Sequence, residues 1–358
     1  MAASPALYRA RSLRWRRIRL VILLAGLIAA DAAAAEVERR LFAMGTELVV
    51  TVSADTRPAA LAASERAVAA IAAVERRLST WRPDSELTRL NAAPVGVPVP
   101  LSAPLAADLA EVQRLWRATG GAFDPAVGSL VRAWGLREGG RRPGAAELGE
   151  ARRAGDFGRL ALTGRSATRL AAGLILEEGG FAKGVGLDAA LEAARGPGVG
   201  RVVVDLGGQL AVAGGALELD LVAPRDRSRR LARVRVASGS VATSGNGERG
   251  AIVDGARVGH ILDPRTGRPA RGFGSLTVWA PTATEADALA TGLYVLGPDA
   301  ALEWAADHPG IEVAVVEDDV RGLRVRATPG LAAIAVATAI PIETSHGAVA
   351  GRAQGGRP

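Results

Sequence analysis

The sequence contains no cysteine. No disulfide can therefore stabilise the fold, and no cysteine is available to receive a lipid anchor. This absence suits an oxidising compartment without establishing one. Aromatic side chains make up only 4% of the 358 residues, whereas hydrophobic residues as a whole make up 49%. The chain is therefore long and apolar enough for one large domain or two ordinary ones.

Lysine is almost as rare as cysteine. Of the 44 basic residues only Lys183 is a lysine, and the other 43 are arginine. This lysine lies in the glycine-rich stretch GGFAKGVG, residues 179–186. A compact ammonium acts as a point charge that fits tight spaces, which a planar guanidinium does not replace. Chance in a chain rich in alanine and arginine is the alternative interpretation.

The excess of positive charge is confined to the N-terminal segment. The formal net charge is +7, but six arginines lie before residue 20. From Glu36 onward, 38 basic residues face 36 acidic ones, so this part of the chain is nearly neutral. The charge pattern therefore gives no case for binding nucleic acid, and we expect no nucleic-acid partner.

Hydrophobic runs long enough to span a membrane are also missing. The apolar run LVILLAGLIAA at residues 20–30 has 11 residues, too few for a mature transmembrane helix. Arginines precede it and the small residues of DAAAAEVE follow it, an anatomy typical of a secretory signal peptide. We therefore expect residues 1–35 to be a cleaved signal peptide and the mature chain to begin near Glu36. A twin-arginine signal at RRIRL is weakened by Arg19, which stands where an apolar residue is usual.

The hydrophobic periodicity predicts a mixture of helices and strands. Helices are predicted at residues 57–79, 103–121 and 184–195, and a pair broken at Gly297-Pro298 is predicted over 284–308. Strands are predicted at residues 46–54, 159–164, 167–173, 174–178, 217–224, 231–238 and 323–327, and a strand, a turn and a second strand are predicted within 201–215. The helices and strands do not alternate regularly, so we predict an α+β fold rather than a doubly wound sheet. We place one domain at residues 36–330 and a C-terminal tail at 331–358, whose last part we expect to be disordered.

The stretch GGFAKGVG could bring its backbone close to a phosphate. Glycines let a backbone approach a ligand, N–H groups at a helix start attract anions, and Lys183 would add a full charge. The stretch lacks the G-x-x-x-x-G-K-[ST] spacing of a Walker A loop. From these residues alone, a structural turn and an anion site both remain open.

A second stretch, TEADALATG at residues 284–292, offers oxygen ligands. Asp287 and Thr291 are four residues apart and project from one face of the predicted helix. A carboxylate and a hydroxyl, with substrate phosphates and water, commonly hold Mg²⁺. The alternative is a solvated aspartate and a threonine that bonds its own helix backbone.

A third stretch, GHILDPRTGRP, places His260 just before a predicted tight turn. Of the three histidines, His308 lies in a DHPG turn and His346 in the tail, so only His260 lies beside other special residues. A single histidine is more often structural than catalytic, and both roles stay open. In GAFDPAVGSLVRAWG, residues 121–135, Asp124 follows a helix end and could be only a cap.

The order of these segments resembles the ApbE family of FAD:protein FMN transferases, and the likeness covers nearly all of residues 40–320. The matching segments are MGT at 44–46, ERRLSTWRPDSELTRLN at 75–91, GAFDPAVGSLVRAWG at 121–135, EEGGFAKGVGLD at 177–188, VVDLGGQLAVAGG at 203–215, ATSGNGERG at 242–250, GHILDPRTGRP at 259–269 and TEADALATG at 284–292. The resemblance implies mixed or antiparallel sheets with flanking helices. The predicted signal peptide fits this family, because many such enzymes act outside the cytoplasm, and we expect export to the periplasm or the cell exterior.

The resemblance further implies an activity. An FAD pyrophosphate is clamped by Mg²⁺, a threonine hydroxyl of an acceptor protein attacks the FMN-side phosphorus, and AMP leaves. FMN then remains attached through a phosphoester link. The implied acceptor is a membrane redox-complex subunit with a target threonine. The alternatives are an FAD pyrophosphatase that gives FMN and AMP, and a non-catalytic flavin-binding assembly factor in the periplasm.

By position in the family pattern, the resemblance also assigns roles to residues of this chain. The implied Mg²⁺ ligands are the Gly180 carbonyl, Asp287 and Thr291. The implied FAD contacts are Met44, Trp81, Ala122, Phe123, Asp124, Glu177, Lys183 and Ile261. His260 matches a histidine proposed to deprotonate the threonine, and Asp287 is a competing candidate for that role.

The chain departs from the family pattern at two of these positions. Glu177 stands where aspartate is usual, which adds a methylene and could shift a hydrogen bond. Trp81 stands where tyrosine is common, which keeps a stacking ring but exchanges a hydroxyl for an indole N–H. Neither change removes a metal ligand or Lys183, so we interpret both as tuning.

Overall fold

The computed structural model describes residues 34–247, 250–320, 322–345 and 349–350. The predicted signal peptide lies outside these residues except for its last two positions, and so do residues 351–358 at the end of the predicted tail. Within the described residues, no helix combines the length and apolarity needed to cross a bilayer.

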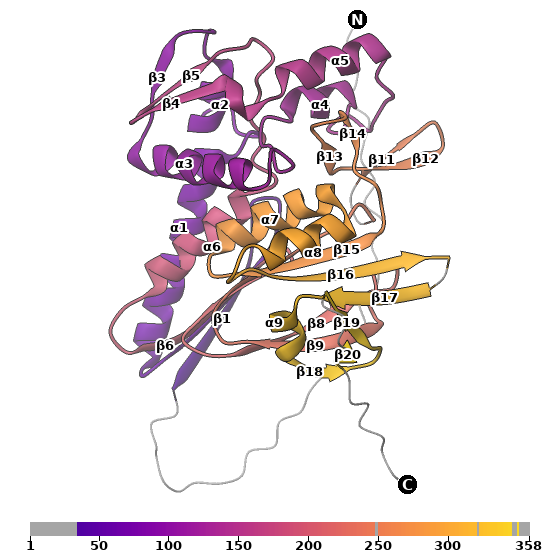
Figure 1. Ribbon diagram of the computed structural model, residues 1–358. Coiled ribbons are helices and arrows are strands. Elements are labelled where there is room, and N and C mark those ends of the chain that lie inside the picture. Colours follow the sequence, from indigo (N-terminus) through magenta and orange to yellow (C-terminus); the bar gives the residue numbers. More distant parts are fainter. Residues whose placement is uncertain (1–33, 248–249, 321, 346–348, 351–358) are drawn as a thin grey trace, which may run out of the picture. The chain divides into compact units, whose positions relative to one another are not determined.

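The largest sheet has ten strands in the order β1-β2-β6-β7-β10-β15-β16-β17-β19-β20 (Figure 1). Its strands are β1 (Ala35–Ala43), β2 (Thr46–Ala54), β6 (Val199–Leu206), β7 (Gln209–Ala213), β10 (Gly239–Ser244), β15 (Gly274–Ala280), β16 (Glu312–Asp319), β17 (Gly322–Ala327), β19 (Ile342–Thr344) and β20 (Val349–Ala350). Every neighbouring pair is antiparallel except β17 and β19, which are parallel. The predicted α+β fold with a mixed sheet is therefore confirmed.

Three helices cover one face of this sheet, namely α1 (Arg57–Leu78), α6 (Ala182–Ala194) and α7 (Ala283–Leu296) (Figure 1). The alternation of β2 explains the packing, because Leu48, Val50, Val52 and Ala54 are buried while the residues between them are more exposed. These buried side chains share one hydrophobic cluster with residues of α1 and α6. Thr56 begins α1 as its N-cap and accepts a hydrogen bond from the backbone N–H of Ala59.

A second sheet packs against the opposite face of the first. It has three strands in the order β18-β9-β8, namely β8 (Leu217–Val222), β9 (Arg230–Val236) and β18 (Ala335–Thr338). Leu221, Leu231 and Val234 of this sheet cluster with Val316 and Val325 of β16 and β17. The ten-stranded sheet is therefore covered by helices on one face and partly by strands on the other.

The remaining elements lie outside the two sheets described above (Figure 1). The helices are α2 (Glu86–Ala92), α3 (Ala103–Ala118), α4 (Gly128–Ala133), α5 (Ala145–Ala154), α8 (Pro298–Ala306) and α9 (Pro329–Ala333). The strands are β3 (Pro98–Pro100), β4 (Leu160–Thr163), β5 (Ser166–Arg169), β11 (Gly250–Val253), β12 (Ala256–Gly259), β13 (Leu262–Asp263) and β14 (Arg268–Pro269).

Three sequence-based expectations differ from the structure. The strand predicted at residues 174–178 is wrong: this segment forms only an isolated bridge between Ile175 and Val127. Its backbone bonds go to the loop before α4, where Gly128 N–H donates to the Ile175 carbonyl. The helix predicted from residue 184 begins two residues earlier, so Lys183 lies in the first turn of α6. Beyond residue 330, where we expected the tail, α9 continues and β18 and β19 pair with other strands.

Candidate active site

A cavity of about 740 Å³ brings most of the predicted site residues together. Its volume lies in the range of small-molecule and cofactor sites. The predicted residues that line it are Trp81, Ala122, Phe123, Asp124, Glu177, Gly180, Lys183, His260, Ile261, Asp287 and Thr291. Segments far apart in the sequence therefore meet around one cavity, as the sequence-based hypothesis requires.

Lys183 is paired with Asp287 across the helices α6 and α7. The Lys183 Nζ lies 2.8 Å from Asp287 Oδ1, and the Gly184 N–H donates to Asp287 Oδ2 over 3.0 Å. The Asp287 side chain is 6% exposed and that of Lys183 is 26% exposed. The solvated aspartate of the alternative interpretation is therefore wrong, because this carboxylate is buried and bonded at both oxygens. The threonine bonded to its own helix backbone is confirmed, because the Thr291 hydroxyl donates to the Asp287 carbonyl.

Gly184 permits the close contact between these helices. A Cβ at this position would lie 2.3 Å from the Ala283 carbonyl oxygen, closer than any side chain tolerates. This glycine of GGFAKGVG therefore has a packing role. Gly180 has a different environment, because a Cβ there would lie 3.4 Å from Thr291 Oγ1. The Gly180 backbone and the Thr291 hydroxyl are thus neighbours at the cavity wall.

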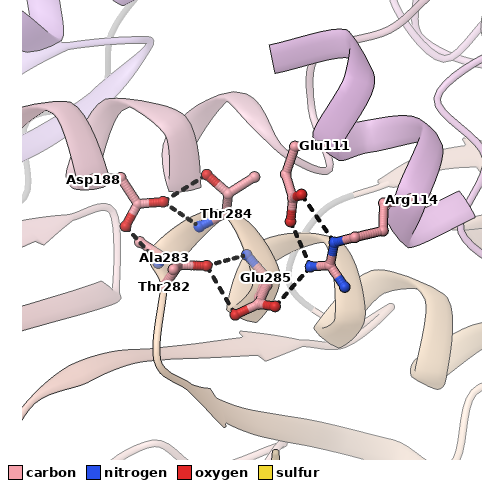
Figure 2. A network of polar contacts seen from close by, with 7 residues as sticks. All are labelled: Glu111, Arg114, Asp188, Thr282, Ala283, Thr284 and Glu285. Carbon is pink, nitrogen blue, oxygen red and sulfur yellow. Dashed lines mark hydrogen bonds and ion pairs between the residues drawn. The ribbon is translucent and has the colours of Figure 1, made fainter. Parts of the chain in front are cut away.

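Asp188 fixes the start of α7 from the middle of α6 (Figure 2). Its carboxylate accepts hydrogen bonds from the Ala283 N–H over 2.7 Å, the Thr284 N–H over 2.9 Å and the Thr284 hydroxyl over 2.6 Å. Burial raises the pKa of Asp188, and the bonds from Thr284 and Ala283 oppose this rise. Asp287 follows Thr284 by three residues, slightly less than one helical turn, so this cap sets the orientation of the candidate ligands. The motifs of the sequence did not predict a role for Asp188.

The N-cap residue Thr282 and an ion pair extend this network to α3 (Figure 2). Thr282 accepts a hydrogen bond from the Glu285 N–H over 3.2 Å and donates its hydroxyl to Glu285 Oε2 over 3.0 Å. Arg114 of α3 donates to Glu285 Oε1 over 2.6 Å and also pairs with Glu111. The N-terminal turn of α7 is therefore held from α3 and α6 together.

The oxygen atoms at the cavity wall fit a hard cation that also takes ligands from its substrate. Asp287 has a carboxylate and Thr291 a hydroxyl at this wall, and the backbone of Gly180 lies beside Thr291. The Thr291 hydroxyl donates to the Asp287 carbonyl over 3.2 Å, and its oxygen keeps lone pairs for another contact. Among the described residues, no group of three or more His, Cys, Asp and Glu side chains could hold a metal. A site with one carboxylate and neutral oxygens suits Mg²⁺ when phosphate and water complete the coordination shell of the ion.

Asp124 lines the cavity with a buried carboxyl group. Its oxygens accept hydrogen bonds from the Ala126 N–H over 2.7 Å and the Phe157 N–H over 3.2 Å. Burial raises the pKa of Asp124 to about 7, although these backbone bonds oppose the rise. Phe123 beside it is buried, and its N–H donates to the Thr119 hydroxyl over 3.1 Å. Asp124 therefore holds a loop together rather than capping α4, which begins at Gly128.

Arg137, to which the sequence analysis assigned no role, lies between two predicted flavin contacts. Its guanidinium forms an ion pair with Glu177 and stacks on Trp81, with 4.2 Å between the guanidinium carbon and the ring centre. Burial raises the pKa of Glu177, and the charge of Arg137 opposes this rise. Trp81 is 69% exposed. No motif containing Arg137 could have identified it, because its partners lie far away in the sequence.

His260 lies directly after β12 on an exposed part of the cavity lining, and Asn246 holds the loop that follows it. The Asn246 side chain accepts from the Ile261 N–H over 2.9 Å and donates to the Ala270 carbonyl over 3.0 Å. The predicted tight turn is confirmed, because the Gly267 N–H donates to the Asp263 carbonyl over 2.7 Å.

Met44 is the predicted site residue that does not line the cavity. It lies in the turn between β1 and β2 with a left-handed backbone, φ +49°. Its sulfur lies 3.3 Å from the point where a Cβ on Gly186 would be. Met44 therefore contacts α6 one turn after Lys183, and its role as a flavin contact stays a prediction.

Comparisons with known proteins give one consistent result. The family model described as the ApbE family matches residues 44–315. The FAD:protein FMN transferase of Treponema pallidum is 32% identical over 344 residues, which is 88% of this chain and 94% of that protein. The FAD:protein FMN transferase of Haemophilus influenzae is 31% identical over 248 residues, covering 65% of this chain and 72% of that protein.

A solved structure agrees with these sequence matches. The crystal structure of the flavinyl transferase ApbE of Pseudomonas stutzeri, in its apo form, superposes with a TM-score of 0.76 at 26% identity. The superposition covers 86% of this chain and 99% of that one. The sheet and its flanking helices are therefore shared along nearly the whole of the solved chain.

Proposed function

This chain belongs to the ApbE family of transferases, and from this premise we propose that it transfers the FMN moiety of FAD to a threonine hydroxyl of an acceptor protein. AMP is the other product, and the reaction depends on Mg²⁺. One observation carries the proposal: the cavity brings the only lysine, Lys183, against a buried Asp287 beside the Thr291 hydroxyl. A lysine ammonium beside oxygen ligands for Mg²⁺ suits the binding of a pyrophosphate, because both cations can contact its oxygens.

The reaction exchanges one phosphorus–oxygen bond for another. The threonine oxygen attacks the FMN-side phosphorus, and the bond from that phosphorus to the bridging oxygen breaks. AMP leaves with the bridging oxygen, and the hydroxyl proton passes to a base on the protein. In such transfers, positioning and charge neutralisation supply most of the catalysis.

Asp287, Thr291 and the Gly180 carbonyl would hold Mg²⁺. When bound, the ion would neutralise charge on the pyrophosphate oxygens. Lys183 lies beside this donor set and adds a second positive charge. The Asp188 cap on α7 keeps Asp287 and Thr291 in fixed positions, so little reorganisation is needed when substrate binds.

The flavin or adenine part of FAD would be bound by Trp81, Ala122, Phe123, Asp124, Glu177 and Ile261, with Met44 as a further contact. The support is that all of them except Met44 line the same cavity as Lys183. Trp81 offers an exposed ring for stacking. The departures at Trp81 and Glu177 keep a ring and a carboxyl group at these positions.

His260 is the proposed base for the threonine hydroxyl. It lines the cavity from its exposed side, where an acceptor protein could present a side chain. Asp287 is less suited to take this proton, because its carboxylate would hold Mg²⁺ and lies beside the Lys183 ammonium, and both cations favour its charged form. We further propose that the chain is exported to the periplasm and that its acceptor is a membrane redox-complex subunit.

The test mixes the purified mature chain with FAD, Mg²⁺ and several acceptor domains that carry a threonine. Mass spectrometry of the acceptor should show a gain equal to FMN, and chromatography should show AMP. Asp287→Ala should abolish both signals. The control Asp299→Ala removes an exposed carboxylate outside the cavity lining and should retain full transfer.

Other outcomes would assign the alternatives. Release of FMN and AMP without any acceptor would favour a pyrophosphatase. Tight FAD binding without turnover would favour a flavin-binding assembly factor. The absence of a mass gain on every acceptor would contradict the proposed transfer.

A further inference from the structure

Arg137 joins three segments of the chain at the cavity. It lies between α4 and α5, and its Nη2 donates to Glu177 Oε2 and, over 2.5 Å, to the Thr80 hydroxyl. Its guanidinium carbon lies 4.2 Å from the centre of the Trp81 ring. Thr80 and Trp81 follow α1, whereas Glu177 precedes α6. One side chain thus links the end of α1 to the segment that leads into α6.

The segment after α1 is anchored at a second point beside this arginine. Glu178 accepts hydrogen bonds from both the backbone N–H and the hydroxyl of Thr80, the former over 3.1 Å. Thr80 is therefore fixed by Glu178, and Trp81 next to it is fixed by the stacked guanidinium. A planar guanidinium can donate in its plane while its face covers a ring, which an ammonium cannot do.

The two departures from the family pattern both contact this arginine. Glu177 reaches Arg137 Nη2, and an aspartate at this position would be one methylene shorter. Trp81 presents the aromatic ring that binds cations best. The two changes noted in the sequence are therefore parts of one arrangement centred on Arg137.

We propose that Arg137 is a positioning residue that holds Trp81 as a stacking platform for FAD. This inference rests on the proposed function, because FAD is the ring-bearing substrate that the cavity would take. Trp81 is 69% exposed although Arg137 lies on its ring, so ring surface stays available for stacking. Within the described part of the chain, no other aromatic ring stacks on it. A ring that is already held loses less freedom when the substrate binds.

The experiment measures FAD binding to the apo chain without any acceptor, through quenching of flavin fluorescence. Arg137→Ala should raise the Kd about tenfold, as expected from the loss of one stacked and ion-paired side chain. With an acceptor, the KM for FAD should rise by a similar factor while kcat stays close to that of the wild type. Arg137→Lys should recover only part of the binding. The control Arg142→Ala removes an exposed arginine of the same segment and should change nothing.

A double-mutant cycle tests whether Arg137 acts through Trp81. Trp81→Ala should weaken FAD binding, and adding Arg137→Ala should weaken it by much less than in the wild-type background. Glu177→Asp is a second variant that keeps the charge but withdraws it from the guanidinium, and it should resemble Arg137→Ala. Thermal melting of each apo variant shows that it is folded before binding is measured.

Three results would overturn the inference: unchanged FAD binding in Arg137→Ala, full recovery by Arg137→Lys, or additive effects in the cycle. Failure of the proposed function would look different. In that case the wild type would bind FAD without transferring FMN, and the effect of Arg137→Ala on FAD binding would persist.

Discussion

The Nζ of Lys183 lies 2.8 Å from Oδ1 of Asp287, so the only lysine of the chain is paired with the carboxylate of the candidate metal-ligand set. This pair also joins α6 to α7 where Gly184 lets the two helices approach closely. Space beside Asp287 is limited, since its side chain is 6% exposed. A compact ammonium suits this position better than a branched guanidinium, which gives the rare residue a physical reason.

Replacement of Lys183 should therefore impair catalysis strongly, because its ammonium is paired with the proposed metal ligand Asp287. Lys183→Ala removes a positive charge next to the proposed pyrophosphate site, and we expect kcat/KM to fall about 100-fold. Lys183→Arg keeps the charge but not the size, so it should recover only part of the activity. FMN transfer to an acceptor, followed by mass spectrometry, measures both variants. Full activity in the arginine variant would show that the single lysine is an accident of composition.

The candidate ligands predict a specific metal dependence. Asp287→Asn weakens the donor set and leaves Lys183 without its carboxylate, so transfer should need far more Mg²⁺ and be at least about 100-fold slower. Thr291→Val removes one neutral oxygen ligand and should have a smaller effect in the same direction. Mg²⁺ titrations after chelation of bound metal give the half-saturating concentration for each variant. Equal values for the wild type and Asp287→Asn would remove Asp287 from the metal site.

Much of the fold could be predicted because local patterns determine it. The alternation of residues 46–54 and the long periodic segment at 57–79 correspond to β2 and α1. The strands β1, β15 and β16 were not predicted from the sequence. Their positions in the sheet depend on partners far along the chain, such as the pairing of β15 with β10 and β16. Residues 174–178 resemble a strand in composition, but no neighbouring strand extends the single bridge at Ile175.

The candidate site could be predicted only in part, for a similar reason. Motifs and the family resemblance identified part of the cavity lining, including Lys183 and Asp287. They did not identify Asp188, Asn246 or Arg137, which hold those residues in place. Each of these three acts on a distant segment, as when Asp188 caps a helix that begins 95 residues later. Such contacts arise from tertiary packing and leave no local signal in a single sequence.

The proposed base His260 can be compared with His308, a histidine that does not line the cavity. If His260 takes the proton of the threonine, His260→Ala should lower kcat about 10²- to 10⁴-fold and leave FAD binding unchanged. The acid limb of the pH–rate profile should also disappear. His308→Ala is the control, because this ring stacks on Trp304 and does not line the cavity. A normal pH profile in His260→Ala would assign the base to another group.

The buried carboxyl of Asp124 should make stability depend on pH. Because burial raises the pKa of Asp124 from 3.8 to about 7, the native state keeps this proton at pH values where the unfolded chain has lost it. The free energy of unfolding should therefore fall as pH rises between these values, by up to ~1.4 kcal/mol per pH unit from this group, and level off above them.

Asp124→Asn provides the comparison, since an amide does not titrate. Urea unfolding of both proteins from pH 5 to pH 8 should show the wild type losing stability relative to the variant up to about pH 7. Parallel stability curves would mean that Asp124 titrates alike in the folded and unfolded chains. If the wild type and Asp124→Asn showed the same pH dependence of stability in the presence of FAD, the Asp124 carboxyl would be shown to interact with FAD in the cavity.

The contact between α6 and α7 predicts opposite effects for two helical glycines. Alanine is normally the better helix former by about 1 kcal/mol, so Gly149→Ala in α5, where only a flexible arginine side chain is near, should stabilise the protein. At Gly184 the added Cβ would lie 2.3 Å from the Ala283 carbonyl, and the helices must move apart. We expect Gly184→Ala to lower the free energy of unfolding by ~1–3 kcal/mol and to weaken FAD binding, because the Lys183–Asp287 pair spans the same contact. Urea unfolding and FAD titration measure the two effects, and a gain of stability in both variants would contradict the close helix contact.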